Sequence, residues 1–105
     1  MRTLKFIVKD QTIQQDPECD FSGLVPGSDG HISAEFSFSE EWTGCLKIVG
    51  FSSGNKEYTP QVLNASNICE IPYKALERNM FRIQVFGKKA NLKLITNKII
   101  IKQGG

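Results

Sequence analysis

The sequence predicts an all-β protein, a two-sheet β-sandwich of about seven strands. Seven runs with strand-like composition recur through the 105 residues, separated by clusters of glycine, proline, asparagine, aspartate and serine. Residues 36–51 hold two runs of alternating apolar and polar residues, joined at Trp42, the only tryptophan. Only residues 72–78 suit a helix, and they allow two turns at most. Together these observations favour a sandwich or a small barrel over an α/β arrangement.

The first three expected strands cover residues 4–9, 31–38 and 45–51. The first alternates apolar residues with lysines, and the second alternates phenylalanine with serine after an Asp-Gly turn. In the third strand both faces are apolar. Side chains of a strand point alternately to its two faces, and here Leu46 and Ile48 share one face while Val49 and Phe51 share the other. We expect the set that contains Leu46 and Ile48 to face the core.

Three further strands are expected at residues 57–63, 68–71 and 80–86, the last on the strength of its regular apolar alternation. Between the second and third of these, residues 72–78 begin with Pro72, which suits the first position of a helix. A short helical turn that crosses from one sheet to the other is therefore expected here.

The final expected strand, residues 92–102, changes phase along its length. Its apolar residues share one face up to Leu94 and the opposite face from Ile99 onward. A bulge or bend near 96–97 would reconcile the two halves. Across all strands and the tryptophan corner, the expected core residues are Leu4, Phe6, Val8, Phe36, Phe38, Trp42, Leu46, Ile48, Phe81, Ile83, Val85, Ile99 and Ile101.

Length and composition indicate one globular domain over residues 1–105. A chain of this size can bury a core without a metal or a disulfide. It has no apolar run of about 18 residues, and its N-terminus lacks the apolar segment of a signal peptide. We therefore expect synthesis in the cytoplasm and no membrane partner. Cys19, Cys45 and Cys69 are odd in number and widely spaced, and we expect reduced thiols.

The net charge of +2 conceals an asymmetry along the chain. Residues 1–45 carry three basic and eight acidic side chains, whereas residues 71–105 carry eight basic side chains and one acidic. A basic C-terminal third can meet phosphates or an acidic protein surface. Nucleic acid is not an expected partner, since no exposed aromatic cluster accompanies the lysines. Because the first and last strands are neighbours in many sandwiches, we expect the two excesses to neutralise each other in part.

No constellation of residues indicates catalysis, and we expect no enzymatic activity and no cofactor. His31 is the sole imidazole, and no nucleophile motif accompanies it. Glu40 and Glu41 are adjacent, so their side chains diverge in an extended chain and form a polar corner rather than a catalytic pair. The remaining alternative is a loose calcium site built from acidic side chains of one loop region: Asp16, Glu18, Asp20 and Asp29.

Three aromatic residues are candidates for contact with a ligand or a partner: Trp42, Tyr58 and Tyr73. Trp42 has two interpretations. As a structural residue it plugs one end of the sandwich, and as a functional residue it offers a platform for stacking a sugar ring. The absence of a row of further tryptophans favours the plug.

Short motifs along most of the chain, from about residue 16 to residue 101, resemble small virion-structural domains of phages and prophages in Firmicutes. They comprise Asp16-Pro17, Cys19-Asp20-Phe21, Gly23, Phe36-Ser-Phe-Ser-Glu-Glu-Trp-Thr-Gly44, Phe51, Tyr58, Cys69, Ile71-Pro72, Leu76, Phe81, Val85, Gly87, Thr96-Asn97 and Ile99.

This resemblance implies an immunoglobulin-like (Ig-like) β-sandwich of a tail, baseplate or head-fibre protein, and it supplies no catalytic residues. The implied function is virion assembly or attachment, with other virion proteins as partners, a homo-oligomer as one form of assembly, and a host surface glycan as a target. The alternative function is a carbohydrate-binding module that uses Trp42, Tyr58 or Tyr73.

Overall fold

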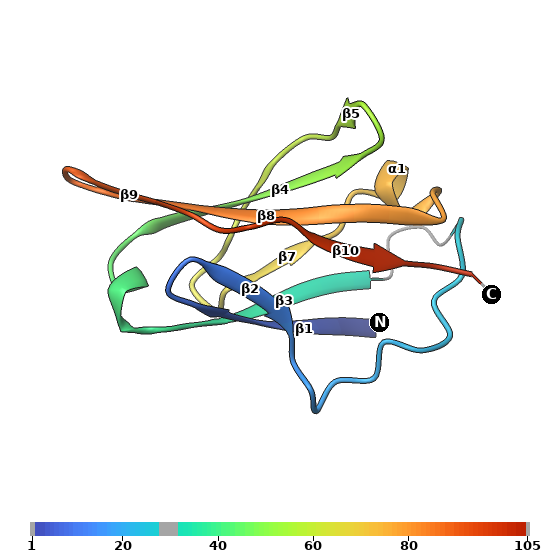
Figure 1. The fold of residues 1–105 in the computed structure, drawn as a ribbon, viewed down its shortest axis with the longest axis horizontal. Helices are drawn as coiled ribbons and strands as arrows, with labels where there is room; N and C mark the ends of the chain where they lie inside the picture. Colours follow the sequence, from blue (N-terminus) through green and yellow to red (C-terminus); the bar gives the residue numbers. More distant parts are fainter. Residues whose placement is uncertain (1, 28–31, 105) are drawn as a thin grey trace.

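The protein is a β-sandwich whose two sheets pack face to face (Figure 1). The computed structural model describes residues 2–27 and 32–104. Strands account for 53% of the described residues, well above the 20–25% typical of globular proteins, so the all-β prediction is confirmed. Asp29 and His31, both considered above, lie outside the described residues. Within the described residues, no helix is long and apolar enough to cross a membrane.

The first sheet is built mainly from the N-terminal part of the chain, in the order β2-β1-β3-β7. β1 pairs antiparallel with β2 and parallel with β3, and β3 pairs antiparallel with β7. Alternation along β1 and β3 points their apolar side chains toward the second sheet. The bounds are β1 (Arg2–Lys9), β2 (Thr12–Gln15), β3 (Ile32–Phe38) and β7 (Ile68–Glu70).

The second sheet has the order β10-β8-β4-β5, with β6 also paired to β4 and β9 also paired to β8. Its centre is the long antiparallel β4–β8 ladder. The expected strand at 57–63 forms the separate strands β5 and β6, since Pro60 interrupts it. The bounds are β4 (Leu46–Ser53), β5 (Lys56–Glu57), β6 (Gln61–Val62), β8 (Met80–Lys89), β9 (Leu92–Ile95) and β10 (Ile99–Lys102).

The predicted bend in the last strand is confirmed by the pairing register. Phe86 is opposite Ile95, but Ile83 is opposite Ile99, so three steps along β8 face four steps along the other segment. This extra residue is the signature of a β-bulge. The buried Thr96 hydroxyl fills the break, because it accepts a hydrogen bond from a β8 backbone N–H at 3.0 Å.

Two short helices connect the layers. The 3-10 helix η1 (Glu40–Trp42) carries the chain from β3 toward β4, and α1 (Tyr73–Leu76) carries it from β7 toward β8. The predicted helical turn within 72–78 is therefore confirmed. Ala75 and Leu76 of α1 are fully buried, so the turn closes one end of the core rather than lying on the surface.

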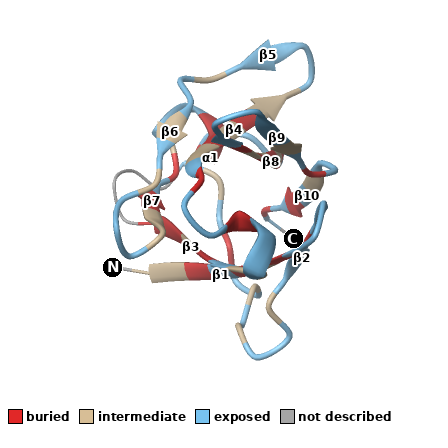
Figure 2. Ribbon diagram, turned by 90° about the vertical axis from the view of Figure 1, so that its left-hand side faces the viewer, coloured by how far each residue is buried: buried red, intermediate tan, exposed pale blue. Residues whose placement is uncertain are grey.

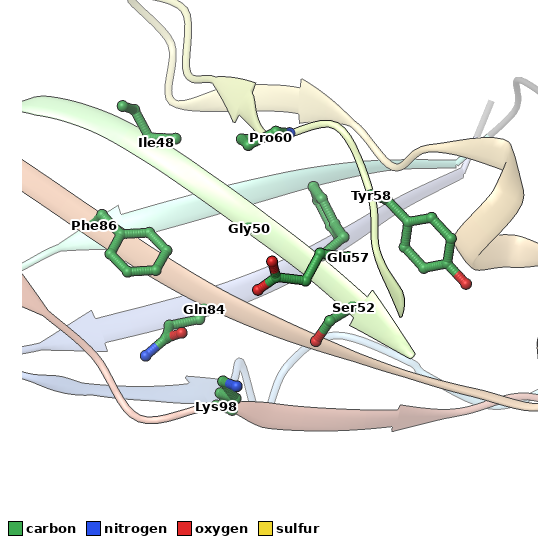
Figure 3. Close-up of a pocket in the computed structure, with 10 residues that line it drawn as sticks. Ile48, Gly50, Ser52, Glu57, Tyr58, Pro60, Gln84, Phe86 and Lys98 are labelled. Atoms are coloured by element: carbon green, nitrogen blue, oxygen red, sulfur yellow. The ribbon is translucent and has the colours of Figure 1, made fainter. Parts of the chain in front are cut away.

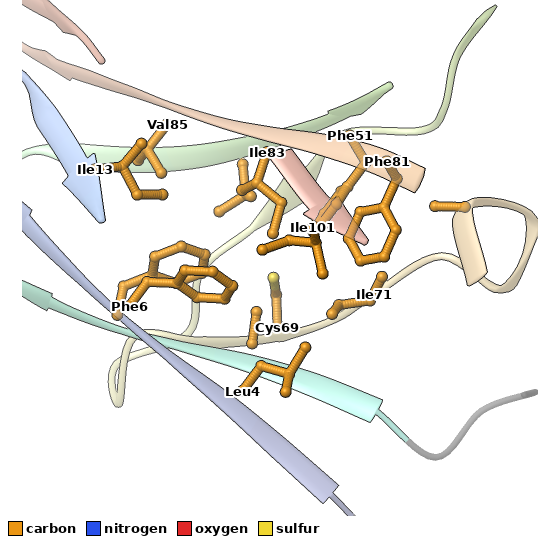
Figure 4. Close-up of a cluster of buried hydrophobic side chains, with 14 of the residues drawn as sticks. Leu4, Phe6, Ile13, Phe51, Cys69, Ile71, Phe81, Ile83, Val85 and Ile101 are labelled. Carbon is orange, nitrogen blue, oxygen red and sulfur yellow. The ribbon is translucent and has the colours of Figure 1, made fainter. Parts of the chain in front are cut away.

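The core lies between the sheets, as the burial colours of Figure 2 and the side chains of Figure 4 show. Most of the predicted core residues are in it, while Phe38 and Ile99 are half-buried at its margin. Its principal members are Leu4, Phe6, Val8, Ala34, Phe36, Trp42, Val49, Phe51, Leu76, Phe81, Ile83, Val85 and Ile101.

The predicted phase of β4 is wrong. Val49 and Phe51 face the core, whereas Leu46 is 55% exposed and Ile48 is half-buried on the outside. The reason is the register with β8, which pairs Val49 and Phe51 with the core-facing Val85 and Ile83. Because both sets of β4 side chains are apolar, alternation alone did not distinguish the inner face from the outer one.

The predicted pairing of the first and last strands is also wrong. β1 lies in the first sheet and β10 in the second, and no ladder joins them within the described residues. The acidic N-terminal half of the chain therefore builds one layer, while the basic C-terminal third contributes β8, β9 and β10 to the other. The two charge excesses are separated between layers instead of being interleaved within one sheet.

Candidate functional site

Trp42 plugs one end of the sandwich. Its side chain is 0% exposed, and its ring lies 5.2 Å from that of Phe38. The indole Nε1–H donates a hydrogen bond of 2.7 Å to the carbonyl oxygen of Asp10, which satisfies its polar atom. The predicted structural role is confirmed, and a fully buried indole presents no surface on which a sugar can stack.

Beside Trp42, the Glu41 carboxylate holds the corner between the layers. It accepts hydrogen bonds from the Ser39 hydroxyl and from the Asp10 backbone N–H, the latter at 3.0 Å. The Ser39 hydrogen bond is the main cause that lowers the pKa of Glu41. Glu41 is thus committed to a turn, as expected of a polar corner.

In the loop that follows β2, Asp16 and Asp20 accept hydrogen bonds from neighbouring residues of the same loop. Asp16 accepts the Glu18 N–H at 2.9 Å. Asp20 accepts both the hydroxyl and the N–H of Ser22, and these bonds lower the pKa of its carboxyl group. Among residues 2–27 and 32–104, no group of three histidine, cysteine, aspartate or glutamate side chains is arranged to hold a metal ion.

The three cysteines are free thiols. Cys45 and Cys69 are buried, and Cys19 is half-buried beside β1. Burial raises the pKa of the Cys69 thiol to about 12, with a smaller contribution from the neighbouring Glu70 carboxylate. Such a thiol stays protonated near neutral pH and is a poor nucleophile.

The other two aromatic candidates, Tyr58 and Tyr73, line one surface hollow of about 660 Å³ between the segment around β5 and the start of α1. Tyr73 is 51% exposed. Tyr58 is half-buried, and its hydroxyl oxygen is buried without a hydrogen-bond partner in the protein. The fold therefore brings these two tyrosines together and leaves Trp42 apart from them. The charged side chains around the hollow are Lys56, Glu57 and Lys74.

The outer face of the second sheet, which points away from the core, carries a continuous row of apolar side chains. The ladders pair Val62 with Ile48, Ile48 with Phe86, and Phe86 with Ile95. Directly paired residues lie on the same face, so four strands contribute to one apolar row: Val62, Ile48, Phe86 and Ile95. Val62 is 60% exposed, and Leu46 lies on the same face next to the row.

A hollow of about 430 Å³ lies beside the apolar row, over Gly50 (Figure 3). A Cβ atom at Gly50 would come within 3.2 Å of the Phe86 ring, so the absence of a side chain here lets that ring lie against the backbone. Ile48 and Pro60 supply further apolar lining. The polar residues that border the hollow are Ser52, Glu57, Gln84 and Lys98.

The same outer face is basic. The strands β8, β9 and β10 flank the apolar row, and their pairing shows which of their side chains point to the outer face. Most of the charged side chains on that face are cations. Arg82 is held by the Ser52 hydroxyl and the Gly54 carbonyl oxygen. The lysines Lys88, Lys93, Lys98 and Lys102 are exposed. Glu57 is the acidic side chain at the hollow.

Sequence reasoning missed this face, because it assigned Ile48 to the core and expected the basic residues to be neutralised in part by the acidic N-terminal part of the chain. The available signal was the third strand itself, in which both alternating sets are apolar although only one can face a single core.

No protein-family model matches this chain, and neither a curated protein nor a solved structure matches it.

Proposed function

We propose that this chain is a non-enzymatic structural protein of a phage or prophage virion, which mediates tail, baseplate or fibre assembly or attachment. The observation that carries the proposal is the exposed apolar row on the outer face of the second sheet. An apolar centre rimmed by polar and charged groups has the composition of a protein–protein interface. The motifs that resemble virion domains, and an Ig-like classification of the sandwich, supply the biological setting.

In this proposal the chain forms one domain over residues 1–105 that is made in the cytoplasm and then enters the particle. Its partners are other virion proteins, including further copies of itself. Among the described residues, β10 and β5 end the strand order of the second sheet, and both are short, which limits pairing with a foreign strand and favours contact through a sheet face.

The test uses particles purified after prophage induction in a strain that carries the gene. We expect mass spectrometry to find the chain in intact particles, and absence from them would refute the proposal. A Val62→Asp variant places a charge in the apolar row at a 60% exposed site, and we expect it to be depleted from particles about tenfold or more. The matched control is Leu92→Asp, at a 43% exposed apolar site near the hairpin tip, which should be incorporated normally.

A second candidate function, carbohydrate binding, is favoured by the hollow that Tyr58 and Tyr73 share. Aromatic rings that can stack on a sugar ring suit a saccharide ligand. A glycan array probed with the wild-type chain and with Tyr73→Ala tests this function. Binding that is lost in the variant supports it, and the absence of binding by the wild type, or equal binding by both, rejects it.

A further inference from the structure

We propose that the hollow beside the apolar row receives the acidic turn of a second copy of this chain, so that copies join head to tail. We define the acidic turn as residues 16–19, Asp16-Pro17-Glu18-Cys19. This proposal deepens the assembly function proposed above, on which it rests for its biological setting, by naming the partner and the contacting segment.

The acidic turn is held in one conformation by its own hydrogen bonds. The backbone N–H of Cys19 donates to the Asp16 carbonyl oxygen at 3.0 Å, and the Glu18 N–H donates to the Asp16 carboxylate at 2.9 Å. Pro17 at the second position of the turn restricts φ as such turns require. The Cys19 sulfur lies 3.4 Å from the Lys5 backbone nitrogen, which fixes the turn to β1. A segment ordered in this way loses little conformational entropy when it binds.

The corner of the acidic turn presents an apolar ring between two carboxylates. Pro17 and Glu18 are both exposed, and Asp16 is half-buried. Phe86 and Pro60 give the hollow an apolar lining, and its border holds one cation, Lys98, and one anion, Glu57. The excess of positive charge that complements the acidic turn comes from the lysines of the surrounding outer face. In the proposed contact, Pro17 of one copy packs on the Phe86 ring of the next, and the Asp16 and Glu18 carboxylates face the lysines of the outer face. Apolar groups then meet apolar groups, and opposite charges meet each other.

The two surfaces lie at opposite poles of the molecule. In Figure 1 the segment that follows β2 forms the lowest part of the fold, below the first sheet, while the outer face of the second sheet is directed upward. Figure 2, turned by 90°, shows the same separation along the vertical axis. One copy therefore cannot fill its own hollow, and its acidic turn is available to another copy.

A contact between two different patches of the same chain is heterologous, so it generates a ring when the rotation closes and an open chain when it does not. A turn inserted in a hollow buries less than the roughly 1,200 Å² of a stable interface. The association is therefore expected to be weak, concentration-dependent, and sensitive to salt because much of it is carried by exposed charges.

The experiment reverses the charge of each surface separately. The face variant is Lys93→Glu with Lys98→Glu, and the turn variant is Glu18→Lys, all at exposed side chains. Sedimentation velocity on the purified full chain measures mass against concentration, from about 20 mM to about 500 mM salt. Circular dichroism and thermal unfolding establish that each variant is folded as the wild type.

We expect the wild type to associate at low salt and to dissociate at high salt. The face variant is repelled by the acidic turn, and the turn variant has no net charge on its turn, so each alone loses the attraction and should sediment as a monomer. In an equimolar mixture the lysine at position 18 meets the glutamates of the face variant, and association should return at least in part. The proposal is overturned if the wild type is monomeric at every concentration, if either variant alone associates like the wild type, or if the mixture stays monomeric.

The virion assay separates this result from the function proposed above. A wild-type chain that enters particles but never self-associates overturns the head-to-tail contact and leaves the virion role standing. A chain that self-associates through the two surfaces but is absent from particles supports the head-to-tail contact and refutes the virion role.

Discussion

Replacing Gly87 by alanine tests the packing of the tryptophan plug. Gly87 lies on the core side of β8, where an added Cβ would be 2.5 Å from Cζ3 and 2.7 Å from Cε3 of Trp42. Its φ lies outside the left-handed region, so alanine meets no backbone penalty there and the cost is steric. Carbon atoms in contact normally lie about 3.5–4.0 Å apart. The indole must therefore move by roughly 1 Å.

The indole has no free direction in which to move. Trp42 is 0% exposed, and its N–H is tied to the Asp10 carbonyl oxygen at 2.7 Å. Overpacking of a filled core costs about 1–3 kcal/mol, and weakening of that hydrogen bond adds about 1 kcal/mol. We expect Gly87→Ala to lower the free energy of unfolding by about 2–4 kcal/mol. For a chain of this size each kcal/mol lowers Tm by about 4–8 °C.

The matched control is Gly50→Ala in the neighbouring strand β4, on the opposite face of the same sheet. Its added Cβ would lie 3.2 Å from the Phe86 ring, which is half-buried and able to swing outward. We expect a change within about 0.5 kcal/mol, because reduced entropy of the unfolded chain offsets the small displacement. Urea unfolding followed by circular dichroism and by Trp42 fluorescence measures both variants. Equal stability of Gly87→Ala and Gly50→Ala would refute the steric argument.

Four further predictions concern individual side chains. Because the Cys69 thiol keeps its proton to about pH 12 in the fold but only to about pH 9 when unfolded, the free energy of unfolding should fall as pH rises through this interval, more steeply than in Cys69→Ala. Native-state alkylation should label Cys19 well before Cys69. The hydrogen bond from Ser39 lowers the pKa of Glu41 in the folded protein, so the ionised carboxylate stabilises the fold above the pKa that Glu41 has in the unfolded chain. This stabilisation should be lost as the pH falls through the folded-state pKa. Thermal unfolding as a function of pH should therefore show a smaller loss of Tm at acid pH in Glu41→Gln than in the wild type. Thr96→Val leaves a buried N–H unpaired and should cost about 1–3 kcal/mol in urea unfolding, whereas Thr96→Ser should cost less than about 1 kcal/mol.

The fold class was predictable because strand alternation is a local property of the sequence. The strands with one polar and one apolar face, such as β1 and β8, have the phase that the alternation predicts. β2 was missed because Ile13 is its only apolar residue. A signal was nevertheless present in the two-residue turn Asp10-Gln11, since aspartate tolerates the positive φ of 54° observed there.

The candidate surfaces were harder to predict, since they depend on which strands are neighbours. The burial of Trp42 could be predicted from its residue type and from its position at the corner between two strands. The apolar row, in contrast, takes residues from β6, β4, β8 and β9, and their alignment is set by three separate ladders. Nothing in the local sequence specifies that Ile48 stands beside Phe86. The approach of Tyr58 to Tyr73 likewise depends on where the chain returns after crossing between the sheets.

The plug and the apolar row are two sides of the same piece of β8. Gly87 points inward beneath Trp42, and Phe86, the preceding residue, points outward into the row. Because consecutive side chains of a strand share one backbone, we expect the part of the Gly87→Ala clash that the indole does not absorb to shift β8 and, with it, the Phe86 ring over Gly50. The segment from Phe36 to Phe51 therefore contributes to both faces of the second sheet. It places Trp42 against the inner face at Gly87, and it places Ile48 of β4 on the outer face next to Phe86. It follows that Gly87→Ala should weaken contact at the outer face even under conditions in which the variant is fully folded.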